Sequence, residues 1–159
     1  MKIAVIGLGY VGLPLCVALA RRFDVVGFDI DGSRIAEIVA GNDRTGEISE
    51  PDLQSSAATF SNDQNALDGT DVFIVTVPTP VDASNQPDLR AVEAASATVG
   101  SHIAKGAIVV FESTVYPGVT EDICGPILAA ASGLVCGTEF FLGYSPERIN
   151  PGDREHTVD

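Results

Sequence analysis

The feature that most constrains the fold is a glycine-rich motif, GLGYVG, at residues 7–12. It directly follows a short apolar run at residues 3–6 and opens a predicted helix. A strand, a glycine-rich turn and a helix in this order are typical of the first unit of a dinucleotide-binding α/β fold. In such a turn, Gly7 permits the tight bend, and Gly9 lets the backbone approach a pyrophosphate. Gly12 then lets the helix pack closely against the strand.

An acidic residue at the expected distance supports a dinucleotide site. Asp29 ends the second predicted strand, residues 25–28, and lies 17 residues after Gly12 and 22 after Gly7. A carboxylate there accepts hydrogen bonds from a ribose diol and repels a 2′-phosphate, which favours NAD over NADP. Arg34 leaves NADP open, because a guanidinium can accommodate that phosphate. With Asp29 present, we expect Arg34 to lie over the adenine edge or the ribose. The alternative is a glycine turn without a ligand.

The rest of the chain alternates apolar runs with helical stretches. Further strands are predicted at residues 72–77, 107–111 and 140–143. A turn followed by a helix is predicted at residues 8–22, and helices at residues 33–39, 51–56, 88–105 and 118–131. The helix at residues 88–105 has Asp88 as its expected N-cap. Alternating strands and helices indicate a parallel sheet with helices on both faces. With 45% hydrophobic residues in 159 and no visible linker, we expect one doubly wound α/β domain of the Rossmann type.

The charge balance excludes several kinds of partner. Nine basic and 22 acidic residues give a net charge of −13, which repels nucleic-acid phosphates and anionic membranes. We therefore expect no nucleic-acid and no membrane partner. The chain has three cysteines, Cys16, Cys124 and Cys136, an odd number without a CxxC pair. This pattern argues against a disulfide framework and against a zinc site. His102 and His156 have no companion at ligand spacing, so no metal is predicted.

The N-terminus raises a separate alternative. Residues 3–20 are eighteen uncharged residues between basic ends, as in a signal peptide or a short membrane segment. The same stretch contains four helix-breaking residues within eight positions: Gly7, Gly9, Gly12 and Pro14. A targeting segment rarely tolerates this, and we expect a cytoplasmic protein.

Three further segments directly follow predicted strands: VPTP at residues 77–80, STVYPG at 113–118 and SPERINPG at 145–152. In an open parallel sheet the ligand crevice lies beyond the carboxyl ends of the strands, so the three segments are expected to converge there. The hydroxyls of Thr79 and Thr114 could then bind a nicotinamide ribose or a water. Alternatively, they only cap their own loops.

Glu147 and Arg148 are oppositely charged neighbours in this predicted crevice. A carboxylate there could order a water or act as a base, and a guanidinium could hold an anionic or carbonyl group. The alternative is a surface ion pair that contributes little to stability.

Together, and in this order, these motifs resemble the UDP-glucose/GDP-mannose dehydrogenase family. The resemblance rests on GLGYVG, on Asp29 with Arg34, and on EPDL, VPTP, STVYPG and SPERINPGD, the last at residues 145–153. It covers essentially the whole chain and matches the N-terminal, NAD-binding domain of that family. The resemblance implies an enzyme that oxidises the C6 hydroxymethyl group of a nucleotide sugar to a carboxylate with two NAD⁺.

The resemblance also implies roles for single residues. Contacts with NAD would come from Tyr10, Val11, Asp29, Arg34, Thr79 and Thr114. Thr114 and Glu147 would help position the water that hydrolyses a covalent intermediate. Where the UDP-glucose branch has a PEFLRE-like stretch, this chain has ERINPG, with Pro151 in place of the second glutamate. That is similar to the branch acting on UDP-N-acetylglucosamine or -galactosamine in polysaccharide biosynthesis, including the Vi-antigen type, in which Arg148 and Ile149 would touch the substrate.

One part of the family pattern lies outside this sequence. In the family, the nucleophilic cysteine, the catalytic lysine, the central helix and the UDP-binding domain follow beyond residue 159, and no cysteine here matches that motif. We therefore expect residues 1–159 to be an NAD-binding fragment, inactive alone, of a homo-oligomeric enzyme. The alternatives are a free-standing NAD-sensing module, another β-hydroxyacid-type dehydrogenase, or a dehydrogenase of UDP-glucose or UDP-N-acetylmannosamine.

Overall fold

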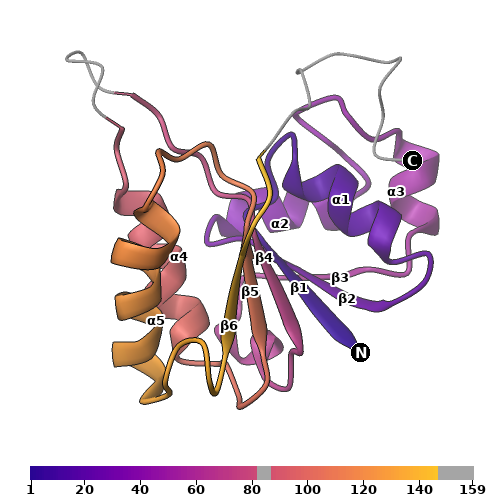
Figure 1. Ribbon diagram of the computed structural model, residues 1–159. Coiled ribbons are helices and arrows are strands. Elements are labelled where there is room, and N and C mark those ends of the chain that lie inside the picture. The colour runs from indigo at the N-terminus through magenta and orange to yellow at the C-terminus, as the bar shows by residue number, and fades with distance from the viewer. Residues whose placement is uncertain (82–86, 147–159) are drawn as a thin grey trace.

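The computed structural model of the protein describes residues 1–81 and 87–146. Within them, six strands form one parallel sheet in the order β3-β2-β1-β4-β5-β6 (Figure 1). The strands are β1 (Lys2–Ile6), β2 (Asp24–Phe28), β3 (Thr59–Ser61), β4 (Val72–Val75), β5 (Ile108–Phe111) and β6 (Phe141–Tyr144). This is the strand order of the doubly wound dinucleotide-binding fold, and it confirms the fold class expected from the sequence.

Helices cover both faces of the sheet. On one side lie α1 (Gly12–Leu19), α2 (Gly32–Val39) and α3 (Glu50–Ser55). On the other lie α4 (Arg90–Gly100), the π-helix η2 (Val119–Cys124) and α5 (Gly125–Ser132) (Figure 1). A short 3₁₀-helix, η1 (Gln64–Leu67), follows β3 and precedes β4 in the chain. No helix in the described ranges has both the length and the apolar character needed to cross a membrane.

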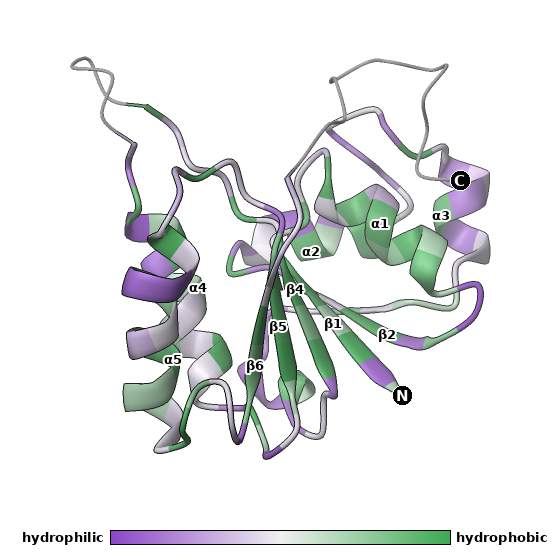
Figure 2. Cartoon of the chain, in the orientation of Figure 1, coloured by the Kyte–Doolittle hydropathy of each residue, from purple (hydrophilic) through white to green (hydrophobic). Residues whose placement is uncertain are grey.

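Strand β1 shows how the sequence produces two layers. Ile3 and Val5 belong to the apolar cluster beneath α1 and α2, whereas Ala4 and Ile6 belong to the cluster beneath α4 and α5. Because successive side chains of a strand point to opposite faces, a strand covered on both faces is a continuous apolar run. Figure 2 shows the same apolar character along β1, β4 and β5. These strands were therefore recognisable in the sequence.

Strand β3 was not predicted. It is only three residues long, contains no apolar run and is only partly buried. Its residues pair in parallel with Val26 to Phe28 of β2, so the neighbouring strand fixes its position. A pattern that looks for buried apolar runs cannot find such an edge strand.

Several predicted helix ends were wrong. The helix expected at residues 88–105 is observed as Arg90–Gly100, and Leu89 occupies the N-cap position that was assigned to Asp88. The carboxylate of Asp88 still accepts a hydrogen bond from the Arg90 amide, at 3.1 Å, and pairs with the Arg90 guanidinium. The turn and helix expected over residues 8–22 are observed, but the helix ends at Leu19 rather than at residue 22. The one expected at 118–131 begins as a π-helix, which hydrophobic periodicity does not reveal.

Candidate dinucleotide site

The glycine turn is built by close contacts that only glycine allows. Gly7 has a φ of +93°, a conformation that other residues rarely adopt. A Cβ on Gly12 would lie 1.9 Å from the carbonyl oxygen of Gly7 and 2.4 Å from Oγ1 of Thr76. Among the described residues, no atom lies within 4 Å of a Cβ built on Gly9. Gly7 and Gly12 are therefore required by the fold, whereas Gly9 leaves its space open.

Thr76 was missed by the sequence reasoning, although it supports this turn. Its hydroxyl follows β4 and donates a hydrogen bond to the Gly7 carbonyl oxygen at 2.7 Å. The Thr76 amide in turn donates to the carbonyl oxygen of Ile6 at 2.9 Å. The residue belongs to an apolar run, so only the pairing of β4 with β1 reveals what its hydroxyl contacts.

Asp29 lies where the motif spacing predicts, at the carboxyl end of β2. One carboxylate oxygen accepts a hydrogen bond from the Leu8 amide at 2.8 Å, and the other accepts one from the Asp31 amide at 2.9 Å. A carboxylate has about four acceptor positions, so two remain for a ligand such as a ribose diol. Asp29 thus both fixes the glycine turn and faces the space next to it.

That space is a pocket of about 500 Å³, within the usual range for small-molecule sites. It lies beyond the carboxyl ends of β1, β2 and β4, where the chain changes from one face of the sheet to the other, as in other doubly wound folds. Its walls include the glycine turn, Asp29, Arg34 and, from α4, small side chains that leave room for a ligand: Ala91, Ala94, Ala95 and Thr98.

Arg34 lines the pocket from α2 and is almost fully buried, with 3% of its surface exposed. Its Nε donates to the Leu8 carbonyl oxygen at 2.8 Å, and one terminal nitrogen, Nη2, donates to Asp43 at 2.8 Å. The other terminal nitrogen, Nη1, has no hydrogen-bond partner among the described residues and lies 3.9 Å from the Glu37 carboxylate. Its expected place over the adenine edge or the ribose stays a prediction.

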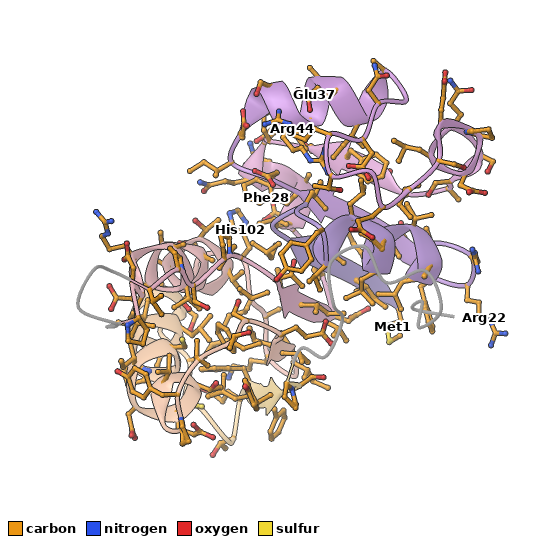
Figure 3. All side chains as sticks on the ribbon, turned by 90° about the horizontal axis from the view of Figure 1, so that it is seen from above. Met1, Arg22, Phe28, Glu37, Arg44 and His102 are labelled. Carbon is orange, nitrogen blue, oxygen red and sulfur yellow. The ribbon has the colours of Figure 1, made fainter. Side chains whose placement is uncertain are left out.

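Arg44 and Thr45 also line the pocket, from the loop after α2, and the sequence reasoning missed both. The Arg44 guanidinium pairs with Glu37 at 2.5 Å and with Asp31 at 3.5 Å. Figure 3 shows Arg44 and Glu37 beside each other at α2. Hydrogen bonds from Ser33, assisted by the nearby Arg44 charge, hold the pKa of Asp31 below its usual value. Both guanidiniums of the pocket therefore already have carboxylate partners.

The loops after β4 and β5 meet, as their placement after strands predicts. The Thr79 hydroxyl donates to the Thr114 carbonyl oxygen at 2.6 Å. The hydroxyl of Ser113, which is buried, donates to the Val77 carbonyl oxygen at 2.6 Å. Two hydroxyl bridges thus join the VPTP and STVYPG loops. Ser113 was not singled out in the sequence, because its partner lies on another strand's loop.

The structure brings together some predicted cofactor residues and not others. Gly7, Gly9, Asp29 and Arg34 line the pocket. The remaining ones are not among its lining residues and lie in the glycine turn, at the start of α1 and on the two joined loops: Tyr10, Val11, Gly12, Thr79 and Thr114. Tyr10 is exposed, and the Val11 side chain is buried.

The predicted catalytic and substrate residues Glu147, Arg148 and Ile149 lie outside the described residues. Thr114, the other predicted catalytic residue, is on the exposed loop after β5. Within residues 1–81 and 87–146, no group of three His, Cys, Asp or Glu side chains is arranged to hold a metal ion.

Comparison with known proteins agrees with this geometry. The model of the UDP-glucose/GDP-mannose dehydrogenase family, NAD binding domain, matches residues 1–158. The chain is 52% identical to Protein CapL of Staphylococcus aureus over 158 residues, covering 99% of this chain and 37% of that protein. It is also 52% identical over 159 residues to UDP-N-acetyl-D-glucosamine 6-dehydrogenase of Pseudomonas aeruginosa, covering 99% and 38%.

A solved structure supports the same assignment. The UDP-D-ManNAc dehydrogenase of Pyrococcus horikoshii has a TM-score of 0.87 at 37% identity, covering 96% of this chain and 37% of that one. The chain thus spans less than two fifths of the length of these relatives. The expected cofactor, NAD, is confirmed by the family model. The chain belongs to the UDP-glucose/GDP-mannose dehydrogenase family and corresponds to its NAD-binding domain.

Proposed function

We propose that this chain is the NAD-binding part of a UDP-N-acetylhexosamine 6-dehydrogenase, which oxidises the C6 hydroxymethyl group to a carboxylate with one water and two NAD⁺. The observation that carries the proposal is the pocket beside the glycine turn, in a chain 52% identical to a relative named UDP-N-acetyl-D-glucosamine 6-dehydrogenase. When bound, NAD accepts a hydride from the substrate carbon. The contribution of this chain is to hold and orient the cofactor.

The residues around the pocket suit each part of a dinucleotide. The backbone amides of the glycine turn and the N-terminal end of α1 suit a pyrophosphate, because they present partial positive charge. The free acceptor positions of Asp29 suit a ribose diol, and Nη1 of Arg34, which makes no hydrogen bond among the described residues, suits an acceptor on the adenosine half. This supports Gly7, Gly9 and Gly12 as the residues that shape the pyrophosphate site.

The joined loops after β4 and β5 support a nicotinamide site next to them. We propose that Thr79 and Thr114 contact the cofactor there and that Thr114 acts together with Glu147 in positioning the hydrolytic water. Contacts of Arg148 and Ile149 with the substrate rest on the family resemblance alone. Tyr10 and Val11 remain proposed contacts at the glycine turn.

The cysteines of this chain do not suit a covalent step at the sugar. Cys16 and Cys124 are buried, and burial raises the pKa of the Cys16 thiol to about 12. Cys136 precedes β6 and so lies towards the amino ends of the strands, opposite the pocket. By the family resemblance the nucleophile is a cysteine, which must reach the sugar carbon as a thiolate. Residues 1–159 alone are therefore expected to bind NAD⁺ without turning over a UDP-sugar.

A domain exchange tests the proposal. This chain would replace the matching 38% of the P. aeruginosa relative, and NADH formation would be followed by absorbance with four UDP-sugars. The sugars are UDP-N-acetylglucosamine, UDP-N-acetylgalactosamine, UDP-N-acetylmannosamine and UDP-glucose. We expect turnover with one of the first two and none by residues 1–159 alone. A chimera that binds NAD⁺ yet oxidises none of them would refute the proposed role and favour an NAD-sensing module.

The proposal also includes expectations about the oligomeric state and the cellular location of the full enzyme. We expect the full enzyme to be a homo-oligomer, which sedimentation of the catalytically active protein would test. A cytoplasmic location also stays a prediction, supported by three cysteines that form no disulfide and suit a reducing compartment.

A further inference from the structure

The loop after α2 is organised around one buried carboxylate, that of Asp43. The side chain is 1% exposed. Its Oδ1 accepts from Arg34 at 2.8 Å and from the amide and hydroxyl of Thr45 at 3.0 and 2.7 Å. Its Oδ2 accepts from the amides of Glu47 and Ile48 at 2.9 and 3.0 Å. These five donors surround a single carboxylate in a loop that borders the pocket.

The five donors decide the charge of Asp43. Burial by itself would raise the pKa of this carboxyl, but the hydrogen bonds from Thr45, Arg34 and the loop amides outweigh it and hold the pKa below its usual value. Asp43 is therefore ionised at neutral pH and neutralises the guanidinium of Arg34. A charge pair of this kind is stable when buried only if its remaining hydrogen bonds are made, as they are on the Asp43 side.

Arg34 connects this loop to the glycine turn. Its Nε holds the carbonyl oxygen of Leu8, while the amide of the same Leu8 is held by Asp29. The backbone N–H and C=O of Leu8 are thus both fixed, by the two side chains expected at the adenosine end. With Nε and one terminal nitrogen in use, Nη1 of Arg34 makes no hydrogen bond among the described residues, although the Glu37 carboxylate lies 3.9 Å from it. A buried donor without a hydrogen bond costs free energy, so a ligand acceptor at this point of the pocket would stabilise it.

We propose that Asp43 is a positioning residue for the cofactor: it orients Arg34 so that Nη1 faces the adenosine half of NAD, and it neutralises Arg34 so that a 2′-phosphate gains little there. This inference rests on the proposed NAD-binding function. Asp43 does not itself contact the cofactor. It acts through Arg34, and removing it changes affinity for the adenosine half alone.

The experiment measures binding of ADP-ribose, which carries the adenosine half without the nicotinamide, by calorimetric titration of residues 1–159. Asp43→Asn is expected to weaken ADP-ribose and NAD⁺ binding by the same factor, about tenfold, the effect of one charge-assisted hydrogen bond. In the same variant, the affinities for ADP-ribose and for ADP-ribose 2′-phosphate should differ by a smaller factor than in the unaltered chain. In an Arg34→Met background, Asp43→Asn should cause no further loss of affinity.

Two further variants separate positioning from folding. Ser49→Ala removes the N-cap of α3, where the Ser49 hydroxyl accepts from the Asp52 amide at 3.3 Å; the hydrogen bonds of this hydroxyl within the described residues involve neither Asp43 nor Arg34. It should lower the melting temperature and leave ADP-ribose affinity unchanged. Asp43→Glu keeps the charge but displaces the carboxylate, and should also weaken ADP-ribose binding. If the Asp43→Asn protein does not fold, the Asp43→Glu protein is used to test the proposal instead.

Several results would overturn the inference. One such result is a loss of ADP-ribose affinity in the Asp43→Asn/Arg34→Met double variant that equals the product of the two single losses. That result would show that Asp43 does not act through Arg34. Unchanged ADP-ribose affinity in folded Asp43→Asn or Asp43→Glu protein would show that it does not act on the cofactor. If the unaltered chain bound neither ADP-ribose nor NAD⁺, the proposed function itself would fail, and this inference with it.

Discussion

Two glycines of the same turn are expected to respond oppositely to the same substitution. In Gly12→Ala, the new Cβ would lie 1.9 Å from a carbonyl oxygen, and such contacts are not shorter than about 3.0 Å in real structures, so the backbone must move by about 1.1 Å. In Gly9→Ala, the Cβ meets no atom within 4 Å in the described part of the chain. The first change strains the fold, whereas the second places a methyl group where the pyrophosphate is expected.

The magnitudes follow from this geometry. Overpacking against backbone costs about 1–3 kcal/mol, and we expect about 2 kcal/mol for Gly12→Ala after allowing for the better helix propensity of alanine. In a domain of this size that lowers the melting temperature by about 4–8 °C. Gly9→Ala should change the free energy of unfolding by less than about 0.5 kcal/mol. The added methyl group should keep the pyrophosphate from the Gly9 backbone, which removes about one hydrogen bond to a charged group. NAD⁺ binding should therefore weaken by at least about tenfold.

Thermal melts without ligand and calorimetric titrations with NAD⁺ are measured on both variants and on the unaltered chain. Gly46→Ala is unsuitable as a control, since Gly46 has a φ of +71°. Thr59→Val, on the edge strand β3 and away from the pocket, serves instead. The reasoning would be refuted by a Gly12→Ala protein that melts within about one degree of the unaltered chain. Full-strength NAD⁺ binding by Gly9→Ala would refute the pyrophosphate assignment.

Three more outcomes are expected. Asp29→Ala should weaken NAD⁺ binding by about 10- to 100-fold, the loss of hydrogen bonds to a charged group, and should reduce the preference for NAD⁺ over NADP⁺ in competition titrations. Ellman's reagent should label Cys136, which is exposed, at once, and should reach Cys16 and Cys124 only on unfolding, because burial raises the pKa of both thiols. Because the folded-state pKa of Asp43 lies below its unfolded value of about 3.9, its stabilising effect is complete above that pH and is lost as pH falls through the folded pKa. Melting temperatures between pH 6 and 3 should therefore fall less steeply for Asp43→Asn than for the unaltered chain.

The parts of the site that the sequence predicted are those set by local spacing. The glycine turn, the strand before it and Asp29 after the second strand follow one another within a single βαβ unit, so their distances along the chain determine their places in space. Asp43 and Thr76 could not be found in this way. What their side chains do depends on partners that arrive through folding: Arg34 and the loop amides for Asp43, and the glycine turn for Thr76. An aspartate in a polar loop and a threonine in an apolar strand carry no signal of these contacts.

The charges around the pocket explain why the glycine turn must be so closely packed. The adenosine end holds two guanidiniums, Arg34 and Arg44, and four carboxylates that contact them or lie beside them: Asp29, Asp31, Glu37 and Asp43. Side chains therefore give this end no excess of positive charge for a pyrophosphate dianion, in a chain whose net charge is −13. Attraction must come from backbone amides and the N-terminal end of α1, which act only at short range and in fixed directions. The close contact between Gly12 and Gly7 brings these amides together, so displacing it should cost cofactor affinity in addition to stability.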